Sequence, residues 1–425
     1  MTDKDVEGQT WFVEPPDDAW KEGGSIRATA PQPEPQPEPT TTVPQPIPFE
    51  FRGDAREYFK IWVVNLALTL VTLGIYSPWA KVRKLRYFYG NTYLDGSSFE
   101  FLGSPIAILK GRIIAVMAFG SYWLAANFYP VANLVLLPVF AVFFPWVFVK
   151  TLTFRSRNSA YRNLTFSYQG RYLQIAAAYL GFPLLLLGAG YAMFHLAGIS
   201  TLPASPPAKL SPEDGRKAGM IFGVIAVVSL IVFPYFYYLQ KRAFVAPRRF
   251  GDTAFGFAAG PKDFYGLLIK TLFVVMLGLV IMGGMSVWLS SAKVMGVHRS
   301  AAGGSVVTPI MIMLFILLVE LLLFVTFITW TRNLVLSALR IGAAQLASRL
   351  RVGEIFLLYL TNIIAIVCTL GLLIPWAKVR LMRYQMSKTS LLAPQGTENF
   401  TGGPGQSASA VGEELAEFFD LDLSL

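Results

Sequence analysis

Apolar residues along this chain fall into eight long runs separated by shorter basic stretches. Most runs approach the ~20 residues that an α-helix needs to cross ~30 Å of hydrocarbon. None shows the strict alternation of a strand. Because backbone groups in lipid must be hydrogen-bonded within their own structure, the pattern predicts an all-helical multi-pass membrane bundle. The runs lie at residues 61–76, 113–129, 131–149, 173–199, 218–239, 271–290, 306–330 and 355–376.

Short aromatic strings precede several of these runs. Residues 49–53, 99–103 and 166–170 each read aromatic–x–aromatic–x–Gly, and residues 255–260 and 350–353 are degenerate copies. Alternation that ends in glycine predicts a short strand and a turn, which we expect at the membrane face.

The order of strings and runs predicts a modular chain. Three two-helix hairpins, at 113–149, 173–239 and 271–330, are bracketed by two single-segment units. The bracketing units resemble each other: residues 57–92 align with 354–389 at an offset of 297 without a gap, and 15 of 36 positions are identical. We interpret this as an internal duplication. The matched motif residues are Thr72, Gly74, Pro78, Trp79, Lys81 and Arg83, and then Thr369, Gly371, Pro375, Trp376, Lys378 and Arg380.

Basic residues predict the side of the membrane that each loop occupies. Residues 78–112, 150–171, 241–270 and 332–351 are rich in Lys and Arg, and the turns within the hairpins carry fewer. Basic loops are cytoplasmic, so both copies of the Pro-Trp-Ala-Lys-Val-Arg motif should lie in the cytoplasm. This favours six full spans plus two terminal segments that re-enter or lie shallow, with both termini cytoplasmic. Eight simple spans are the alternative.

Composition agrees with a membrane protein. Of 425 residues, 54% are hydrophobic and 15% are charged, against about 25% charged in ordinary soluble domains. Residues 1–49 and 389–425 each carry a net charge of −6, which leaves +22 on residues 50–388. A basic apolar core suits anionic lipid headgroups better than nucleic acid, which needs a solvated basic domain.

The domain organisation follows from the same pattern. We expect disordered acidic tails at 1–48, which is also rich in Pro, and at 391–425. The membrane domain should occupy residues 49–390.

The motifs also resemble those of a known family. Phe51-x-Gly53, Thr72-Leu73-Gly74-Ile75-Tyr76 and Pro78-Trp79-Ala80-Lys81-Val82-Arg83 are similar to the YjgN-like bacterial inner-membrane proteins, a domain of unknown function. The resemblance covers roughly residues 49–390 and implies a multi-pass inner-membrane location. It supplies no reaction and no catalytic residues. The second copy departs from the pattern where Leu372-Leu373-Ile374 replaces Ile75-Tyr76-Ser77.

Three polar residues inside the apolar runs are candidate sites. Glu320 lies near the middle of the 306–330 run, where a carboxylate costs several kcal/mol unless it is protonated, paired or hydrated. It either belongs to a proton, cation or solute path or bonds to a neighbouring helix. Asn65 and Asn362 are matched amides. They bind a solute across a pseudo-symmetry axis or, as is more common, join neighbouring helices.

The duplicated motif has two interpretations as well. Thr72-Leu73-Gly74 and its copy predict a helix break, which either lines a cavity or is a glycine C-cap followed by a proline-started helix. The basic residues of the motif either anchor the chain at the membrane face or form a site for an anionic headgroup or solute.

The sequence contains no nucleophile–base pair, phosphate loop or metal-ligand cluster, so we expect no enzyme activity, cofactor or metal. Cys368 has no partner for an intrachain disulfide. Two functional hypotheses follow. The first is a transporter or channel for a small solute or lipid. The second is a non-transporting membrane scaffold that recruits protein partners through its acidic tails.

Overall fold

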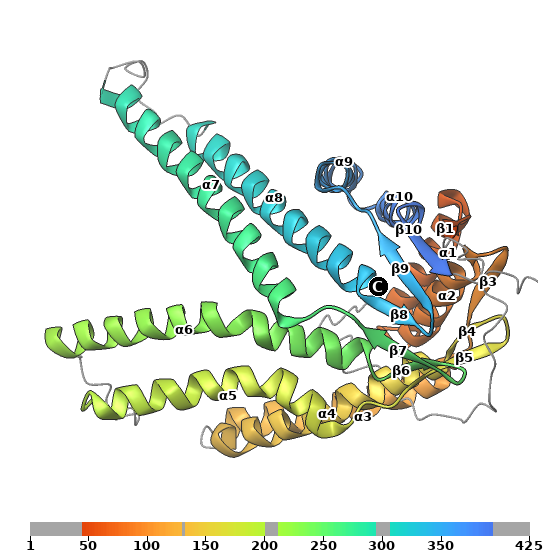
Figure 1. Cartoon of the computed structure of the whole chain (residues 1–425), viewed down its shortest axis with the longest axis horizontal. Helices are drawn as coiled ribbons and strands as arrows, with labels where there is room; N and C mark the ends of the chain where they lie inside the picture. The colour runs from red at the N-terminus through yellow and green to blue at the C-terminus, as the bar shows by residue number, and fades with distance from the viewer. Residues whose placement is uncertain (1–44, 130–131, 200–210, 295–306, 394–425) are drawn as a thin grey trace, which may run out of the picture. The chain divides into compact units, whose positions relative to one another are not determined.

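The computed structural model describes residues 45–129, 132–199, 211–294 and 307–393, and within them ten helices and ten strands (Figure 1). The helices are α1 (Ala55–Val71), α2 (Ser77–Gly90), α3 (Pro105–Phe128), α4 (Ala132–Arg157), α5 (Tyr172–Leu196), α6 (Pro212–Val245), α7 (Pro261–Val294), α8 (Val307–Ser337), α9 (Val352–Cys368) and α10 (Ile374–Ser387). The strands are β1 (Gln45–Phe51), β2 (Thr92–Leu94), β3 (Ser97–Phe101), β4 (Ser159–Tyr161), β5 (Leu164–Tyr168), β6 (Arg248–Phe250), β7 (Thr253–Phe257), β8 (Leu339–Ile341), β9 (Ala344–Ser348) and β10 (Thr389–Ala393).

These elements form five consecutive units of the same construction, each a strand, two helices and a second strand. Two-residue turns join successive units, and at Asp95-Gly96 and Arg162-Asn163 both turn residues have positive φ. This is the backbone that tight hairpins require. The predicted strings are therefore strands, as expected. The second strand of each unit, only three residues long in most of them, was not expected.

The ten strands close into an antiparallel barrel in which neighbours in sequence are neighbours in space. The first and last strands complete it: β1 pairs with β10 from Gln45↔Ala393 to Pro48↔Ser390. Two prolines, Pro46 and Pro48, lie in that half of β1. The sequence predicted the helices of the bundle, but it did not predict that the strands close into a barrel.

One hydrogen bond recurs in all five units and fixes the frame. In every unit, the residue just after the first strand donates its N–H to the carbonyl of the residue just before the second strand. Such a bond ties both ends of a helix pair to one place. The pairs are Arg52→Asn91 (2.9 Å), Leu102→Asn158 (2.8 Å), Gln169→Pro247 (2.8 Å), Ala258→Ala338 (2.8 Å) and Arg349→Lys388 (3.0 Å).

The barrel interior is filled by side chains. Each strand contributes at least one apolar side chain to this interior cluster, and neighbouring aromatic rings are in contact, with Phe99 and Tyr161 at 4.7 Å between ring centroids. Phe166 and Phe250 follow at 4.8 Å. Apolar side chains therefore occupy the inside of the barrel. The inward residues are Phe49, Leu94, Phe99, Tyr161, Phe166, Phe250, Phe255, Ile341, Leu346 and Leu391; we call them the aromatic floor.

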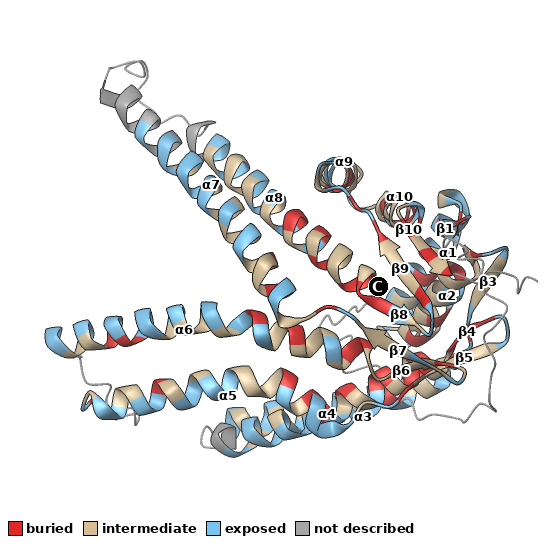
Figure 2. Cartoon of the chain, viewed as in Figure 1, coloured by how far each residue is buried: buried red, intermediate tan, exposed pale blue. Residues whose placement is uncertain are grey.

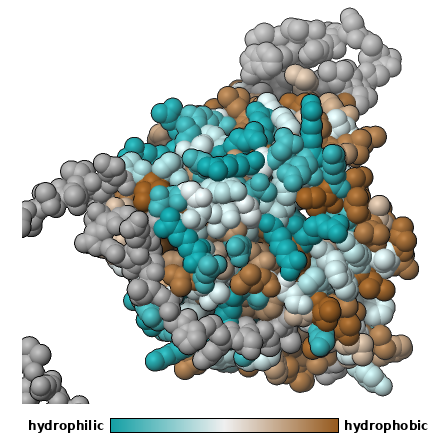
Figure 3. Space-filling view, turned by 90° about the vertical axis from the view of Figure 1, so that its right-hand side faces the viewer, coloured by the Kyte–Doolittle hydropathy of each residue, from teal (hydrophilic) through white to brown (hydrophobic). Residues whose placement is uncertain are grey.

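The three central helix pairs, α3–α4, α5–α6 and α7–α8, supply six helices long and apolar enough to cross a membrane among the described residues. Their outer lengths are exposed, and the buried residues gather near the strands (Figure 2). Leu187 in α5 and Phe273 in α7 are each about 70% exposed, which is the surface expected to meet lipid. The face at the strand end is dominated by hydrophilic residues (Figure 3).

The terminal units are also helix pairs, not single segments as the sequence suggested. α1 and α2 are joined by a tight turn at residues 72–76, and α9 and α10 by its copy. Both helices of each pair return to the barrel. Neither α1 nor α9 is among the helices of spanning length in the described residues; whether the terminal units re-enter, lie shallow or cross stays a prediction. The turns are apolar and open: Leu73 is 94% exposed and Leu370 is 95% exposed.

The tail boundaries differ from the expected ones by a few residues. Residues 45–48, assigned above to the first tail, belong to β1, and residues 391–393 belong to β10. The remainder of both predicted tails lies outside the described residues.

Candidate functional site: a cationic chamber above the aromatic floor

The duplicated residues build the turns of the terminal helix pairs. Thr72 donates its hydroxyl to the Leu68 carbonyl (2.7 Å) and accepts from the Tyr76 N–H (3.0 Å). Thr369 makes the same two bonds at 2.7 and 3.2 Å. Gly74 and Gly371 both have φ +92°, a backbone that only glycine adopts without strain. Pro78 and Pro375 then stand in the first turn of α2 and α10, as a glycine cap followed by a proline start predicts.

The matched asparagines join the two helices of each terminal pair. Asn65 Nδ2 donates to the Ala80 carbonyl (3.4 Å), and its Oδ1 accepts from Arg83 (3.5 Å). Asn362 does the same with Ala377 (3.3 Å) and Arg380 (3.2 Å). Both amides are buried and bonded within their own unit. This geometry corresponds to the interhelical alternative stated above.

Another matched pair, Arg86 and Arg383, connects neighbouring units. Arg86 Nη2 donates to the Gly103 carbonyl (3.4 Å), and Arg383 Nη2 donates to the Gly53 carbonyl (2.9 Å). Each arginine therefore holds the terminal glycine of the following aromatic string. The aromatic two residues earlier, Phe51 or Phe101, covers that glycine so closely that a Cβ there would lie 2.5 Å from its ring.

The predicted intramembrane acid is separate from these groups. Glu320 is exposed on α8, and the described residues give it no hydrogen bond or ion pair. It does not line the cavity described next. Whether it acts in a path stays a prediction.

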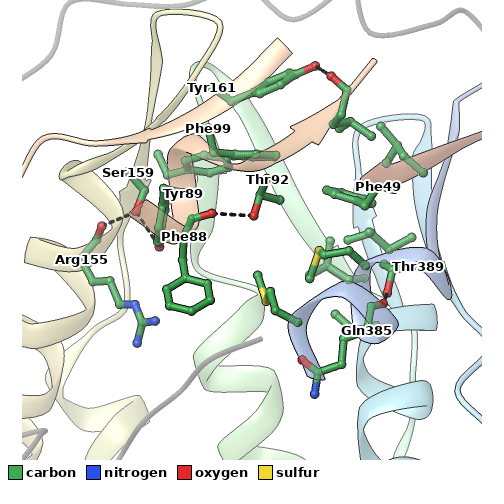
Figure 4. Close-up of a pocket in the computed structure, with 18 of the residues that line it drawn as sticks. Phe49, Phe88, Tyr89, Thr92, Phe99, Arg155, Ser159, Tyr161, Gln385 and Thr389 are labelled. Atoms are coloured by element: carbon green, nitrogen blue, oxygen red, sulfur yellow. Dashed lines mark hydrogen bonds between the residues drawn. The ribbon is translucent and has the colours of Figure 1, made fainter. Parts of the chain in front are cut away.

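A cavity of about 560 Å³ lies between the aromatic floor and the ends of the helices (Figure 4). Its floor includes Phe49, Phe99 and Tyr161. The first residue of the second strand of every unit also lines the cavity, and so do side chains from α2, α4, α8 and α10. Those first residues are Thr92, Ser159, Arg248, Leu339 and Thr389. The volume is typical of a small-molecule site.

Each of the five units contributes one basic side chain to the lining of this chamber, and the described lining residues include no Asp or Glu. The basic residues come from α2, α4, β6, α8 and α10, so they converge only because the barrel closes. Of the residues predicted as sites, only Lys378 is among them. The five are Lys84, Arg155, Arg248, Arg332 and Lys378.

Two of the arginines interact unfavourably. Arg248 stacks over the ring of Phe244, with its guanidinium carbon 3.9 Å from the centroid. Burial and, to a smaller extent, the positive charge of Arg155 together lower the pKa of Arg248 to about 10. The Nε atoms of Arg248 and Arg332 are buried and have no hydrogen-bond partner among the described residues. Clustered cations with unused donors have the chemistry that an anion-binding site needs.

Hydroxyl groups hold the chamber end of α4 in place. Ser159 donates to the Arg155 carbonyl (2.9 Å) and lies 3.2 Å from the Tyr89 hydroxyl. In Figure 4 the Arg155 side chain extends from this point beside Phe88. The sequence signal for the chamber was a basic residue near the end of each unit. Those of the terminal units were also considered for an anionic headgroup or solute, and the others were interpreted only as a mark of cytoplasmic loops.

The comparisons with known proteins identify the family of the chain. The model of the family of bacterial proteins of unknown function (DUF898) matches residues 46–418. The chain belongs to that family. No solved structure matches.

Two relatives carry the same printed name. Inner membrane protein YjgN of Salmonella typhimurium is 23% identical over 356 residues, covering 80% of this chain and 87% of the relative. Inner membrane protein YjgN of Escherichia coli K12 is 47% identical over 53 residues, covering 12% and 13%. With six helices of spanning length among the described residues, these likenesses make the chain a multi-pass inner-membrane protein in contact with the lipid bilayer.

Proposed function

We propose that this protein transports, or conducts, a small anionic solute or lipid, and that the cationic chamber is the binding site on its path. The observation that carries the proposal is the convergence of five basic residues, one from each unit, on a cavity whose described lining includes no carboxylate. An anion there meets several charge-assisted donors, each contributing about 1.5–3 kcal/mol. The proposal assigns the protein no chemical reaction.

The membrane orientation is part of the proposal. The hydrophilic strand end faces the cytoplasm, because the basic residues that follow the second helices gather there. Both termini are then cytoplasmic. The likeness between residues 57–92 and 354–389 is taken as an internal duplication, and the matched bonds of Asn65 and Asn362 support it.

Flux through purified protein in vesicles tests the proposal. A salt gradient across the vesicle should give a potential whose sign indicates anion movement, and Arg332→Gln should lower the flux about tenfold, as loss of one charge-assisted contact predicts. Arg340→Gln is the matched control, because Arg340 is exposed on β8 and does not line the chamber. A flux through vesicles with protein that is no greater than the flux through empty vesicles would reject transport.

Glu320 offers a second test of the path. If it titrates or binds a cation during transport, Glu320→Gln removes the charge and stops the flux while the protein stays folded. If the carboxylate only meets lipid, Glu320→Leu raises the melting temperature and leaves the flux unchanged, since leucine is cheaper in lipid.

The aromatic floor favours a second candidate function. Apolar side chains occupy the inside of the barrel, which suits a non-transporting membrane scaffold that recruits partners through its acidic tails. Under this alternative the chamber holds an anion that only stabilises the fold, and the vesicles show no flux. Removing the acidic tails should then change which proteins are purified together with the chain.

A further inference from the structure

The chamber has two chemically different walls. The aromatic floor and the side chains of Phe88, Met382 and Met386 are apolar. The arginines enter from the helix ends and from β6. A ligand that contacts both walls of the chamber must be amphipathic, with an anionic group joined to an apolar group.

The charged wall favours a phosphoryl group over a carboxylate. Arg155 and Arg248 lie close enough for one charge to disfavour the other, and the described lining residues supply no acid to offset them. A carboxylate carries one negative charge and two oxygens. A phosphoryl group carries up to two charges and three acceptor oxygens, which matches two guanidinium groups.

Unused donors point to the same chemistry. The Nε atoms of Arg248 and Arg332 are shielded from water and lack a partner in the described part of the chain. A buried donor without an acceptor costs free energy. A phosphoryl oxygen within the cavity relieves that cost and the repulsion between the arginines at once.

The apolar wall requires more than inorganic phosphate. Phe49, Phe99 and Phe250 present ring surface to the cavity, and methionine side chains adapt to acyl chains of varied shape. Apolar surface left in contact with water would be unfavourable. An apolar substituent on the phosphoryl group covers it.

We propose that Arg155 and Arg248 bind the phosphoryl group of an amphipathic phosphate ester whose apolar part lies on the aromatic floor. This inference deepens the proposed function, because it names the ligand class of the same site. The ester is a phosphate monoester, either in a membrane lipid such as phosphatidic acid or in a free amphipathic phosphate, and both present the same chemistry to the chamber.

Binding to the full chain in detergent tests the ligand class with three probes. Dioctanoyl phosphatidic acid has both groups, dioctanoylglycerol has the chains alone, and inorganic phosphate has the charge alone. We expect phosphatidic acid to bind at least about tenfold more tightly than either of the others, since each wall contributes separately. Equal binding of dioctanoylglycerol, or of inorganic phosphate, overturns the proposal.

Variants assign the binding to the arginines. Arg155→Gln and Arg248→Gln should each weaken phosphatidic acid binding about tenfold. Arg249→Gln is the matched control, because Arg249 is the next residue, does not line the chamber and donates to the Asp252 carbonyl at 2.6 Å. Unchanged binding in Arg155→Gln and Arg248→Gln overturns the proposal.

Melting temperatures exclude simple unfolding as the cause of lost binding. Each Gln variant removes a charge that has no acidic partner in the described lining, so the variants without ligand should melt no lower than the wild type. Phosphatidic acid should raise the melting temperature of the wild type and of Arg249→Gln only. A rise of equal size in Arg248→Gln contradicts the assignment.

The source of the ester is decided by extraction from vesicles. Protein taken from vesicles of phosphatidic acid and phosphatidylethanolamine should retain phosphatidic acid that Arg248→Gln loses, if the bilayer supplies the ligand. Retention in neither protein, with phosphatidic acid binding intact, identifies a free ester. Binding without flux rejects transport and leaves this assignment standing.

Discussion

The terminal and central helix pairs are built on one strand frame but differ in length. α1–α2 and α9–α10 have 17 and 14 residues each, whereas α6 and α7 have 34. All five pairs nevertheless start and end at the same carbonyl-bonded position on the barrel. The strand frame therefore fixes where each helix pair leaves the barrel and returns to it. The length of the pair then sets how far its helices extend from the barrel.

The duplicated motif belongs to the short pairs. In each pair of 17 and 14 residues, the threonine–glycine turn and the asparagine bonds connect the two helices. The longer α5–α6 pair instead packs along its length, with Gly181 against Phe236 and Gly190 against Ile225. Close contacts at small residues are a common alternative in membranes.

Of the changes proposed for the terminal and central pairs, removal of the last strand should affect the stability of the fold most. A chain that ends at Lys388 lacks β10, so β1 and β9 become unpaired edges and the terminal units lose their common frame. We expect aggregation in detergent, measured by size exclusion. A chain of residues 45–393 should stay monodisperse, and one of residues 49–390 should be less stable, because it loses the β1–β10 pairs from Gln45 to Pro48. A monodisperse chain ending at Lys388 would show that the barrel is dispensable.

Labelling at the helix turns should separate short from long pairs. In a Cys368→Ser background, Leu196→Cys places a thiol at the end of α5, and Leu73→Cys places one at the turn of a short pair. An impermeant maleimide applied to intact cells whose outer membrane is permeabilised should label Leu196→Cys on the order of tenfold more, because the short pair ends within the hydrocarbon.

Both proteins should react equally after denaturation, which controls for expression. Strong labelling of Leu73→Cys in intact cells would mean that the first unit crosses the membrane and that eight spans are correct.

Alanine at two string glycines should have opposite effects. Gly103→Ala places a methyl against the buried ring of Phe101 and should destabilise the protein by about 1–3 kcal/mol. Gly353→Ala meets no atom within 4 Å and lies at the start of α9, so it should be neutral or stabilise by up to about 1 kcal/mol. Chemical unfolding in detergent measures both. Equal costs would show that the ring contact is unimportant.

The asparagine bonds should give the smallest effects. Asn362→Leu and Asn65→Leu should each cost about 0.5–1.5 kcal/mol, the usual contribution of a hydrogen bond. Asn362 should cost more, because its bonds to Ala377 and Arg380 are shorter than those of Asn65. Thermal unfolding of the two variants beside the wild type measures the difference. A larger loss in Asn65→Leu would indicate a role beyond joining the helices.

Part of the fold was predictable from local pattern. The alternation of Phe49 and Phe51 before Gly53 predicted β1, and Gly74 followed by Pro78 predicted the break between α1 and α2. The strand β2 was missed because three residues, Thr92–Leu94, are too short to show a period. The Asp95-Gly96 turn that follows was the available signal.

The chamber was not predictable because its residues are not equivalent in sequence. Lys84 and Lys378 belong to duplicated units, yet they occupy different motif positions, and Arg248 lies on a strand whereas Arg332 lies on a helix. Their proximity depends on closure of the barrel by β1 and β10. Glu320 was selected as a candidate because its neighbours in the sequence are apolar. Neighbours in the sequence do not show which side chains surround Glu320 in the fold.

The pairing of Gln45 with Ala393 has a consequence for biosynthesis. β1 is translated first and β10 last, so at 5–20 residues per second β1 waits on the order of tens of seconds beside the ribosome without its partner. An open strand edge during that time is a template for aggregation. Pro46 and Pro48 remove two N–H donors from the waiting half of β1. The nascent chain therefore carries protection for the edge that it closes only after β10 has been made.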